Sequence, residues 1–163
     1  MRKLRVAQVT LFACGMVIQT GAVSTQERSL KISEPTALAW KPAPDMAPGA
    51  EYVDLHGGLA MTARGTDGLS ITRFKFPDKY RIAPHSHPAD EDMTVISGTF
   101  KVGVGDKVDN AKMQELKAGT HVVIPAGTVH FAETNGNTVV QRTKTGAWGI
   151  TYANPADAPH HKQ

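Results

Sequence analysis

The sequence predicts an all-β domain that folds as a sandwich or barrel. From Glu51 onward, short runs of alternating apolar and polar residues are separated by Gly, Asp, Asn and Pro. The clearest alternations are Ser70–Phe76 and Phe100–Val104, and this period of two places one face of each strand in a core. No long apolar pattern has the 3.6-residue period of a helix. About ten short strands with turn residues between them are typical of an all-β barrel.

Ten segments are expected as strands, joined by turns. They are residues 52–55, 59–63, 69–76, 80–87, 92–97, 99–104, 121–124, 129–133, 138–143 and 148–152. The turns, such as Gly105-Asp106 and Asn135–Asn137, are rich in residues that tolerate positive φ. Only residues 107–116 offer a place for a short helix.

The first 24 residues have the layout of a secretory signal peptide. The basic cluster Met1–Arg5 precedes a mostly apolar run, Val6–Val23, which ends in small residues. Cleavage is expected near Ala22 or Ser24, so the mature protein is predicted to be periplasmic or secreted. The run is too short and too polar for a transmembrane helix, so no membrane insertion is expected after cleavage. Lipidation at Cys14 and a retained N-terminal anchor are the alternatives.

Charge and cysteine content exclude several classes of function. The chain has 18 basic and 15 acidic residues, a net charge of +3. The predicted cleavage removes three basic residues and no acid, so a basic surface for nucleic acid is not expected. Cys14 is the only cysteine, and the mature protein would therefore have no disulfide, thiolate metal site or cysteine nucleophile.

The remaining chain divides into three parts. Residues 25–50 are expected to form an irregular, Pro-rich arm, in which Trp40 packs on the domain or on a second subunit. Residues 51–153 contain all the predicted strands and form the folded domain. Residues 154–163 are expected to be a flexible tail, and the His160-His161 pair within it to be solvated.

The stretch Pro84–Glu91 carries the first group of metal-binding residue types. His85 and His87 point to the same side of an extended strand, and Glu91 is in phase with them if a strand resumes after a short turn. Imidazoles and a carboxylate at this spacing suit a divalent metal ion. A second stretch, Gly119–His130, has the pattern of a strand, a turn and a strand that begins near His130.

Together the two stretches resemble the cupin family. The first resembles the pattern HxHxxxExxxxxxG through His85, His87, Glu91 and Gly98, and the second resembles GxxxxxPxGxxH through Gly119, Pro125, Gly127 and His130. The chain departs from the family at two positions, with Lys79 where Gly is common and Thr134 where Asn is common. Neither is a ligand position.

The resemblance implies a single cupin β-barrel, or jelly roll, with one divalent metal ion inside. The implied ligands are His85, His87, Glu91 and His130. Asp90 and Asp92 compete with Glu91 for the carboxylate role, but strand parity and the six-residue gap to Gly98 favour Glu91. The resemblance also implies a homodimer.

Such a ligand set leaves two positions open on a six-coordinate ion, and Mn, Fe, Ni, Zn, Co and Cu all accept it. The first hypothesis is a secreted metal-dependent cupin that transforms a small oxygen-bearing molecule in a dioxygenase-like or decarboxylase-like reaction. The second is a non-catalytic module that binds a metal or small molecule, such as a sensor. A metal-independent isomerase is disfavoured because the ligand set is complete. The sequence does not decide whether the protein is an enzyme.

Other candidates have weaker support. His121 is placed near the end of the barrel, where it either contacts a ligand residue or lies on the surface of a strand, and His56 is placed in a turn. Arg73, Gln141 and Tyr152 fall on strands that could line the cavity, although an outward position is expected for each. Trp148 is expected to pack the barrel.

Overall fold

The computed structural model describes residues 30–57, 68–146 and 148–159. The strands found there are β1 (Lys41–Pro42), β2 (Glu51–His56), β3 (Leu69–Phe76), β4 (Arg81–Ser86), β5 (Glu91–Val104), β6 (Gln114–Lys117), β7 (His121–Ile124), β8 (His130–Thr145) and β9 (Thr151–Tyr152). Three short 3-10 turns are η1 (Pro35–Ala37), η2 (Asn110–Lys112) and η3 (Pro155–Asp157). In these stretches no helix is long and apolar enough to span a membrane. The predicted all-β class is confirmed.

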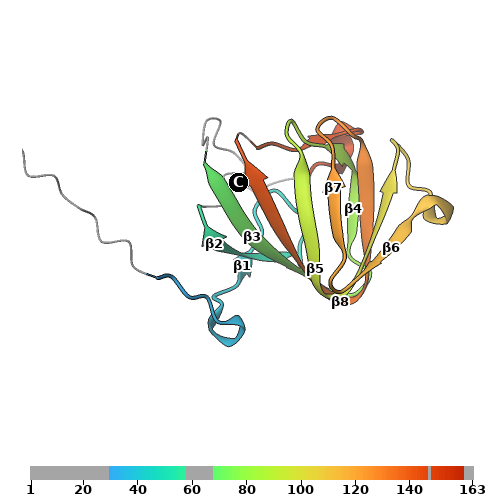
Figure 1. Ribbon diagram of the computed structural model, residues 1–163. Helices are drawn as coiled ribbons and strands as arrows, with labels where there is room; N and C mark the ends of the chain where they lie inside the picture. Colours follow the sequence, from blue (N-terminus) through green and yellow to red (C-terminus); the bar gives the residue numbers. More distant parts are fainter. Residues whose placement is uncertain (1–29, 58–67, 147, 160–163) are drawn as a thin grey trace, which may run out of the picture. The chain divides into compact units, whose positions relative to one another are not determined.

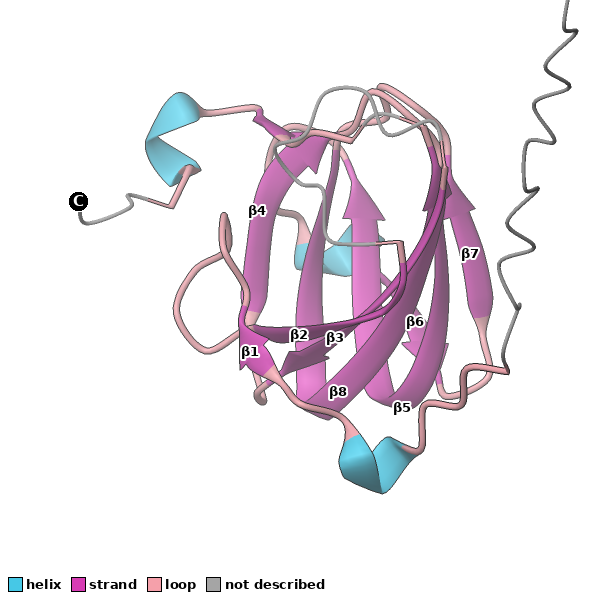
Figure 2. Ribbon diagram, turned by 90° about the vertical axis from the view of Figure 1, so that its left-hand side faces the viewer, coloured by secondary structure: helices cyan, strands magenta, loops and turns pink. Residues whose placement is uncertain are grey.

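β5 and β8 form the spine of the barrel, because they pair along almost their whole length (Figure 1). Asp92 lies opposite Thr143 at one end of this ladder, and Val104 lies opposite His130 at the other. β6 and β7 pair with the second edge of β5, while β3 and β4 pair with the second edge of β8. β2 and β1 extend the sheet beyond β3, and β9 pairs with β4. The sheet curls around an interior (Figure 2), as a jelly roll does.

The spine bends where glycines interrupt the regular pairing. The register between β5 and β8 shifts on both sides of Ser97. Gly98 (φ 76°) and Gly136 (φ 75°) adopt the left-handed backbone that only glycine enters without cost. A Cβ atom on Gly98 would collide with the carbonyl oxygen of Asn137 and lie 2.8 Å from the Cα of Thr138. The bend therefore depends on glycine at position 98.

Several predicted boundaries are wrong. The strand breaks expected at residue 98 and at residues 134–137 do not occur, because bulges let β5 and β8 continue through the bend. Of the predicted helix at 107–116, only η2 is helical, and β6 occupies its end. The arm contains β1, where Pro42 is tolerated at the edge of the sheet. The predicted strand 59–63 lies outside the described residues.

The inward-facing side chains change in character along the barrel. Phe74 and Phe76 of β3 lie in a buried apolar cluster with Val140 of β8, and each buried ring stabilises the fold by about 1.5–3 kcal/mol. Further along the same two strands, the inward positions are the buried pairs Thr72–Arg142 and Ser70–Lys144. The interior is therefore apolar toward one end of these strands and polar toward the other.

Candidate metal centre

Strand pairing between β4 and β8 brings the two histidine stretches together. His85 lies opposite His130, and their ring centroids are 4.2 Å apart. His87 follows the end of β4, and its carbonyl oxygen accepts a 2.8 Å hydrogen bond from the amide of Gly127. This hydrogen bond joins the turn at Pro125–Gly127 to the stretch that carries His85 and His87. The three buried histidines present ring nitrogens that all lie within 4.8 Å of one another.

Each of the three rings is oriented by a hydrogen bond to a backbone carbonyl. The acceptors of the Nδ1 atoms are Ala83 for His85 (2.7 Å), Gly149 for His87 (2.7 Å) and Thr128 for His130 (3.0 Å). A carbonyl oxygen only accepts, so Nδ1 carries the hydrogen in each ring. In the neutral form the lone pair is then on Nε2, and this fixed tautomer is typical of histidines that bind metal ions.

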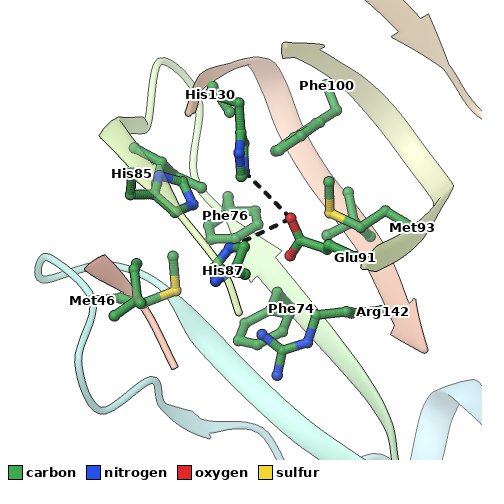
Figure 3. A pocket seen from close by; sticks show the side chains of 14 residues that line it. Met46, Phe74, Phe76, His85, His87, Glu91, Met93, Phe100, His130 and Arg142 are labelled. Carbon is green, nitrogen blue, oxygen red and sulfur yellow. Dashed lines mark ion pairs between the residues drawn. The ribbon is translucent and has the colours of Figure 1, made fainter. Parts of the chain in front are cut away.

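The carboxylate of Glu91 is directed toward two of these rings, as Figure 3 shows. Its Oε2 lies 3.4 Å from Nε2 of His130 and 3.6 Å from Nε2 of His87. Burial alone would raise the pKa of Glu91, but the neighbouring His130, His87 and Arg142 lower it to about 2. Glu91 is therefore ionised at neutral pH inside the barrel.

Burial lowers the pKa of two of the histidines, His85 and His87. Burial, with a smaller contribution from the neighbouring His130, lowers the pKa of His85 to about 4. Burial also lowers the pKa of His87, against the attraction of the Glu91 carboxylate. At neutral pH the site therefore contains a negative carboxylate, and the imidazoles of His85 and His87 resist protonation.

The acidic neighbours of Glu91 have different surroundings. Oδ1 of Asp90 accepts a 2.8 Å hydrogen bond from the amide of Ala126, which supports the turn between β7 and β8. Asp92 lies 3.5 Å from Nε2 of His121, where both side chains are substantially exposed. Of the three consecutive acids, the structure brings only Glu91 to the histidines. It places His121 on the outer surface, where its Nδ1 is hydrogen-bonded to Thr94.

A small cavity opens beside the four groups. The centre of a water molecule can occupy a volume of about 40 Å³ inside it. This is enough room for a few water molecules or a small ligand. The apolar part of its wall consists chiefly of Phe74, Phe76, Met93, Phe100 and Val140. The polar part consists of the three histidines, Glu91 and Arg142.

Arg142 is the site residue that the sequence interpretation missed, whereas Trp148 is buried as expected. The ring of Trp148 stacks on His87 with centroids 4.0 Å apart, so the expected packing role includes direct support of a candidate ligand. The Arg142 guanidinium lies 4.2 Å from the centroid of Trp148 and 4.8 Å from that of Phe74. Alternation along 138–143 could have identified Arg142, because it is in phase with the apolar residue Val140.

The remaining candidates take no part in the cavity wall. Nε of Arg73 donates a 3.1 Å hydrogen bond to Oε1 of Gln141, and these partly exposed residues lie on the face opposite Arg142. Tyr152 lies beside His85 in the β4–β9 pair. His56 ends β2, rather than lying in the predicted turn. His160 and His161 lie outside the described residues.

The two departures from the cupin pattern meet at one turn. Lys79 takes the left-handed backbone (φ 56°) that the usual glycine favours, and its amide donates to the carbonyl of Thr134. The hydroxyl of Thr134 donates to the carbonyl of Pro77 (2.6 Å) and accepts from the amide of Tyr80 (2.9 Å). Thr134 therefore anchors the β3–β4 connection to β8.

Comparison with known families identifies the domain. A family described as a domain of unknown function, DUF4437, matches residues 45–162. The chain belongs to this family. The similarity of this DUF4437 domain to a solved cupin structure shows the cupin fold.

The curated relatives of the DUF4437 chain include germin-like proteins of plants. Germin-like protein subfamily 2 member 1 of Arabidopsis thaliana is 36% identical over 84 residues, which are 50% of this chain and 38% of that protein. Germin-like protein 9-3 of Oryza sativa subsp. japonica is 36% identical over 92 residues, 55% of this chain and 43% of that protein. The chain thus spans less than half the length of the relatives that it matches.

Among solved structures, the DUF4437 domain resembles the polyketide cyclase RemF from Streptomyces resistomycificus. The two have a TM-score of 0.62 and 17% identity, over 76% of this chain and 85% of the cyclase. An RmlC-like cupin from Shewanella frigidimarina has a TM-score of 0.54 and 20% identity, over 73% of this chain and 93% of its own. These similarities establish the cupin fold.

Proposed function

We propose that His85, His87, His130 and Glu91 bind one divalent transition-metal ion. The observation that carries the proposal is the convergence of acceptors around the Glu91 carboxylate. The Nδ1 hydrogens of the three rings point to backbone carbonyls, so in the neutral rings the Nε2 lone pairs of His87 and His130 face Oε2 of Glu91 at 3.6 and 3.4 Å. Buried acceptors that face one another require a cation between them. A single proton can bridge only one of these pairs, whereas a metal ion can be bound by all of the groups.

The spacing of the groups fits this interpretation. Ligand atoms bound at about 2.1 Å are about 3.0 Å apart around an octahedral ion and about 3.4 Å apart around a tetrahedral one. The distances of 3.4 and 3.6 Å between Oε2 of Glu91 and the two Nε2 atoms are close to this range. In addition, Nε2 of His87 is buried and has no hydrogen-bond partner among the described residues. Mn, Fe, Co, Ni, Cu and Zn are all compatible with three imidazoles and a carboxylate.

The function proposed for this site is binding or transformation of a small oxygen-bearing molecule. A bound metal ion would act as a Lewis acid that orients and polarises an oxygen atom of that molecule. The chain itself holds the three imidazoles in one tautomer and surrounds the site with the apolar walls of a cavity of about 40 Å³. Four protein groups would leave two positions on a six-coordinate ion, which supports a dioxygenase-like or decarboxylase-like reaction.

A non-catalytic binding or sensor module is the second candidate, and the composition of the cavity favours it. Among the described residues that line the cavity, the ionisable ones are the four proposed ligands and Arg142. An arginine does not exchange protons at neutral pH. A reaction that needs a separate general acid or base therefore has no group to supply it in this wall. Oxygen uptake and CO₂ release with a panel of small organic acids would separate the two candidates, since a binding module gives neither.

Cobalt(II) titration, followed by visible absorption, tests the proposed ligand set. The wild-type chain is expected to saturate at about one Co²⁺ per chain, while His87→Ala should abolish the absorption. The matched control is His121→Ala, because that ring is exposed beside Asp92 on the outer surface. An unchanged titration of His87→Ala, with His121→Ala behaving as wild type, would show that the ligand set is wrong.

We also propose a periplasmic or secreted location and a homodimer. The location rests on the signal-peptide pattern of residues 1–24, which lie outside the described residues. Amino-terminal sequencing of the protein from its native host should give a mature start near residues 23–25, and light scattering should give twice the chain mass. The domain boundaries expected between residues 50 and 51 and between residues 153 and 154 stay predictions. The nine strands found in the described residues belong to the compact unit of residues 33–163.

A further inference from the structure

One buried cation in the wall of the cavity has two nitrogen atoms without a hydrogen-bond partner among the described residues. Arg142 is only 4% exposed, and its Nε and Nη2 atoms make no hydrogen bond within the described part of the chain. Leaving the donors of a buried charged group unpaired is unfavourable by more than the 1–3 kcal/mol typical of neutral groups. Arginines in such places are therefore expected to have a partner that the folded chain does not itself provide.

The contacts that Arg142 does make leave those donors free. Its Cζ lies 4.8 Å from the ring centroid of Phe74 and 4.2 Å from that of Trp148. Aromatic rings interact with the flat face of a guanidinium group, whereas its N–H bonds lie in the plane. The rings thus hold the side chain in place without satisfying Nε or Nη2. These two atoms lie on one side of the guanidinium group and form a fork that can bind both oxygens of a carboxylate.

The charges around Arg142 also favour an anion. Glu91 and Asp54 attract the guanidinium group, but neither accepts a hydrogen bond from Nε or Nη2. A second cation lies two residues further along β8, on the same face of the strand. Lys144 is 2% exposed, and its Nζ makes a long hydrogen bond of 3.4 Å to the carbonyl of Gly146. Within the described residues, neither Arg142 nor Lys144 forms an ion pair.

We propose that Arg142 binds the carboxylate of the molecule that occupies the cavity. The ligand class is then a small organic acid with an apolar body, because Phe74, Phe76, Met93 and Val140 form the rest of the wall. Arg142 would bind one end of this molecule and direct the other toward His85, His87, His130 and Glu91. This inference deepens the proposed function. The contact between the other end of the molecule and the proposed metal centre rests on that function, whereas the carboxylate contact depends on Arg142 alone.

Calorimetric titration with matched acids and amides tests this assignment. The probes are acetate and butyrate, with acetamide and butyramide as neutral analogues of the same shape, added to the metal-free and metal-loaded protein. The wild type should bind each acid at least about tenfold more tightly than its amide in both forms. Arg142→Gln should lose this preference, and Arg142→Lys should retain part of it, since it keeps the charge but not the fork. Equal binding of acid and amide by the wild type would overturn the proposal.

A matched control and a separate measurement of metal content distinguish this proposal from the metal site. Arg73→Gln is the control, because the side chain of Arg73 lies on the face of the sheet opposite to that of Arg142 and is hydrogen-bonded to Gln141. It should keep the full preference for acids. Metal content of Arg142→Gln should equal that of the wild type. A loss of metal would show that Arg142 supports the metal site instead, whereas a wild-type protein that binds no metal but prefers acids would contradict only the proposed metal centre.

Nuclear magnetic resonance of the wild type covers the case in which Arg142→Gln does not fold. With ¹⁵N-labelled arginine, the Nε–H resonance of Arg142 should shift on addition of butyrate and stay unchanged on addition of butyramide. Arg73 provides the internal reference. Equal responses of Arg142 to both compounds, or none to either, would refute the carboxylate contact. Stronger binding of inorganic phosphate than of any organic acid would likewise refute the proposed ligand class.

Discussion

Glu91 and His130 lie at opposite ends of the β5–β8 ladder, yet Oε2 of Glu91 is 3.4 Å from Nε2 of His130. Glu91 begins β5, and His130 pairs with Val104 at the end of the same strand. The bend at Gly98 and Gly136 explains how the two ends meet, because it turns the long ladder back across the interior. Assembly of the candidate site is therefore a property of the whole spine.

Substitution of Gly98 by alanine should both destabilise the domain and weaken metal binding. The left-handed backbone costs a non-glycine residue about 1–2 kcal/mol, and the collision of a Cβ atom with the carbonyl oxygen of Asn137 adds about 1–3 kcal/mol. Gly119→Ala is the control, since it has φ 89° but open space around the new Cβ. Urea unfolding should show a larger loss for Gly98→Ala. Equal losses would mean that the bend tolerates a side chain.

Glu91→Gln should reduce metal affinity about tenfold or more, because it removes the negative charge while preserving shape. Asp92→Asn is the matched control, as Asp92 lies beside the exposed His121. Competition with a chelator of known affinity measures both variants. If the two lose affinity equally, the buried carboxylate has no special role.

The metal-free domain should lose stability as the pH falls from about 6.5 to 4. The pKa of His85 is lowered to about 4 in the folded state, so in this window the unfolded chain binds a proton that the folded chain does not. The contribution from His85 alone is at most about 3 kcal/mol. Glu91, with its pKa lowered to about 2, extends the same trend below pH 4.5. Urea unfolding at pH 7, 5.5 and 4 measures it, and constant stability across this range would contradict it.

Trp148→Ala should weaken metal binding, whereas Trp148→Phe should not. The indole ring stacks on His87, and its Nε1 is buried without a hydrogen-bond partner among the described residues. Phenylalanine keeps the stacking surface and removes the unpaired donor, so its cost is small. Alanine leaves a cavity, which typically costs about 3–5 kcal/mol. Metal titration together with thermal unfolding of both variants separates the two effects, and equal metal affinities would exclude a supporting role for the ring.

Local spacing made the histidines and Glu91 predictable from the sequence. The period of two along a strand placed His85 and His87 on one side, and the count to Gly98 separated Glu91 from Asp90 and Asp92. The first rule rests on strand geometry, which fixes the direction of a side chain over a few residues. The count to Gly98 and the choice of His130 rest on the resemblance to the cupin pattern. The structure agrees with them on the position of each of these groups.

Features that depend on contacts between distant strands were not predictable in the same way. Asn135–Asn137 has the composition of a turn, yet pairing with β5 holds it within β8. Arg142 is buried, although a charged residue on a strand is normally exposed. Its register against Thr72 and Met93 decides that it faces the interior. Alternation with Val140 indicates this face of β8, but only packing of the complete barrel decides that a charged side chain stays on it.

Elemental analysis of the mature protein, purified from its native compartment without added chelator, tests the central claim most directly. A single site formed by His85, His87, His130 and Glu91 predicts close to one transition-metal ion per chain. His130→Ala, purified in parallel, should contain almost none. A wild-type content below about 0.2 ions per chain would contradict the metal centre, since a filled structural site approaches full occupancy.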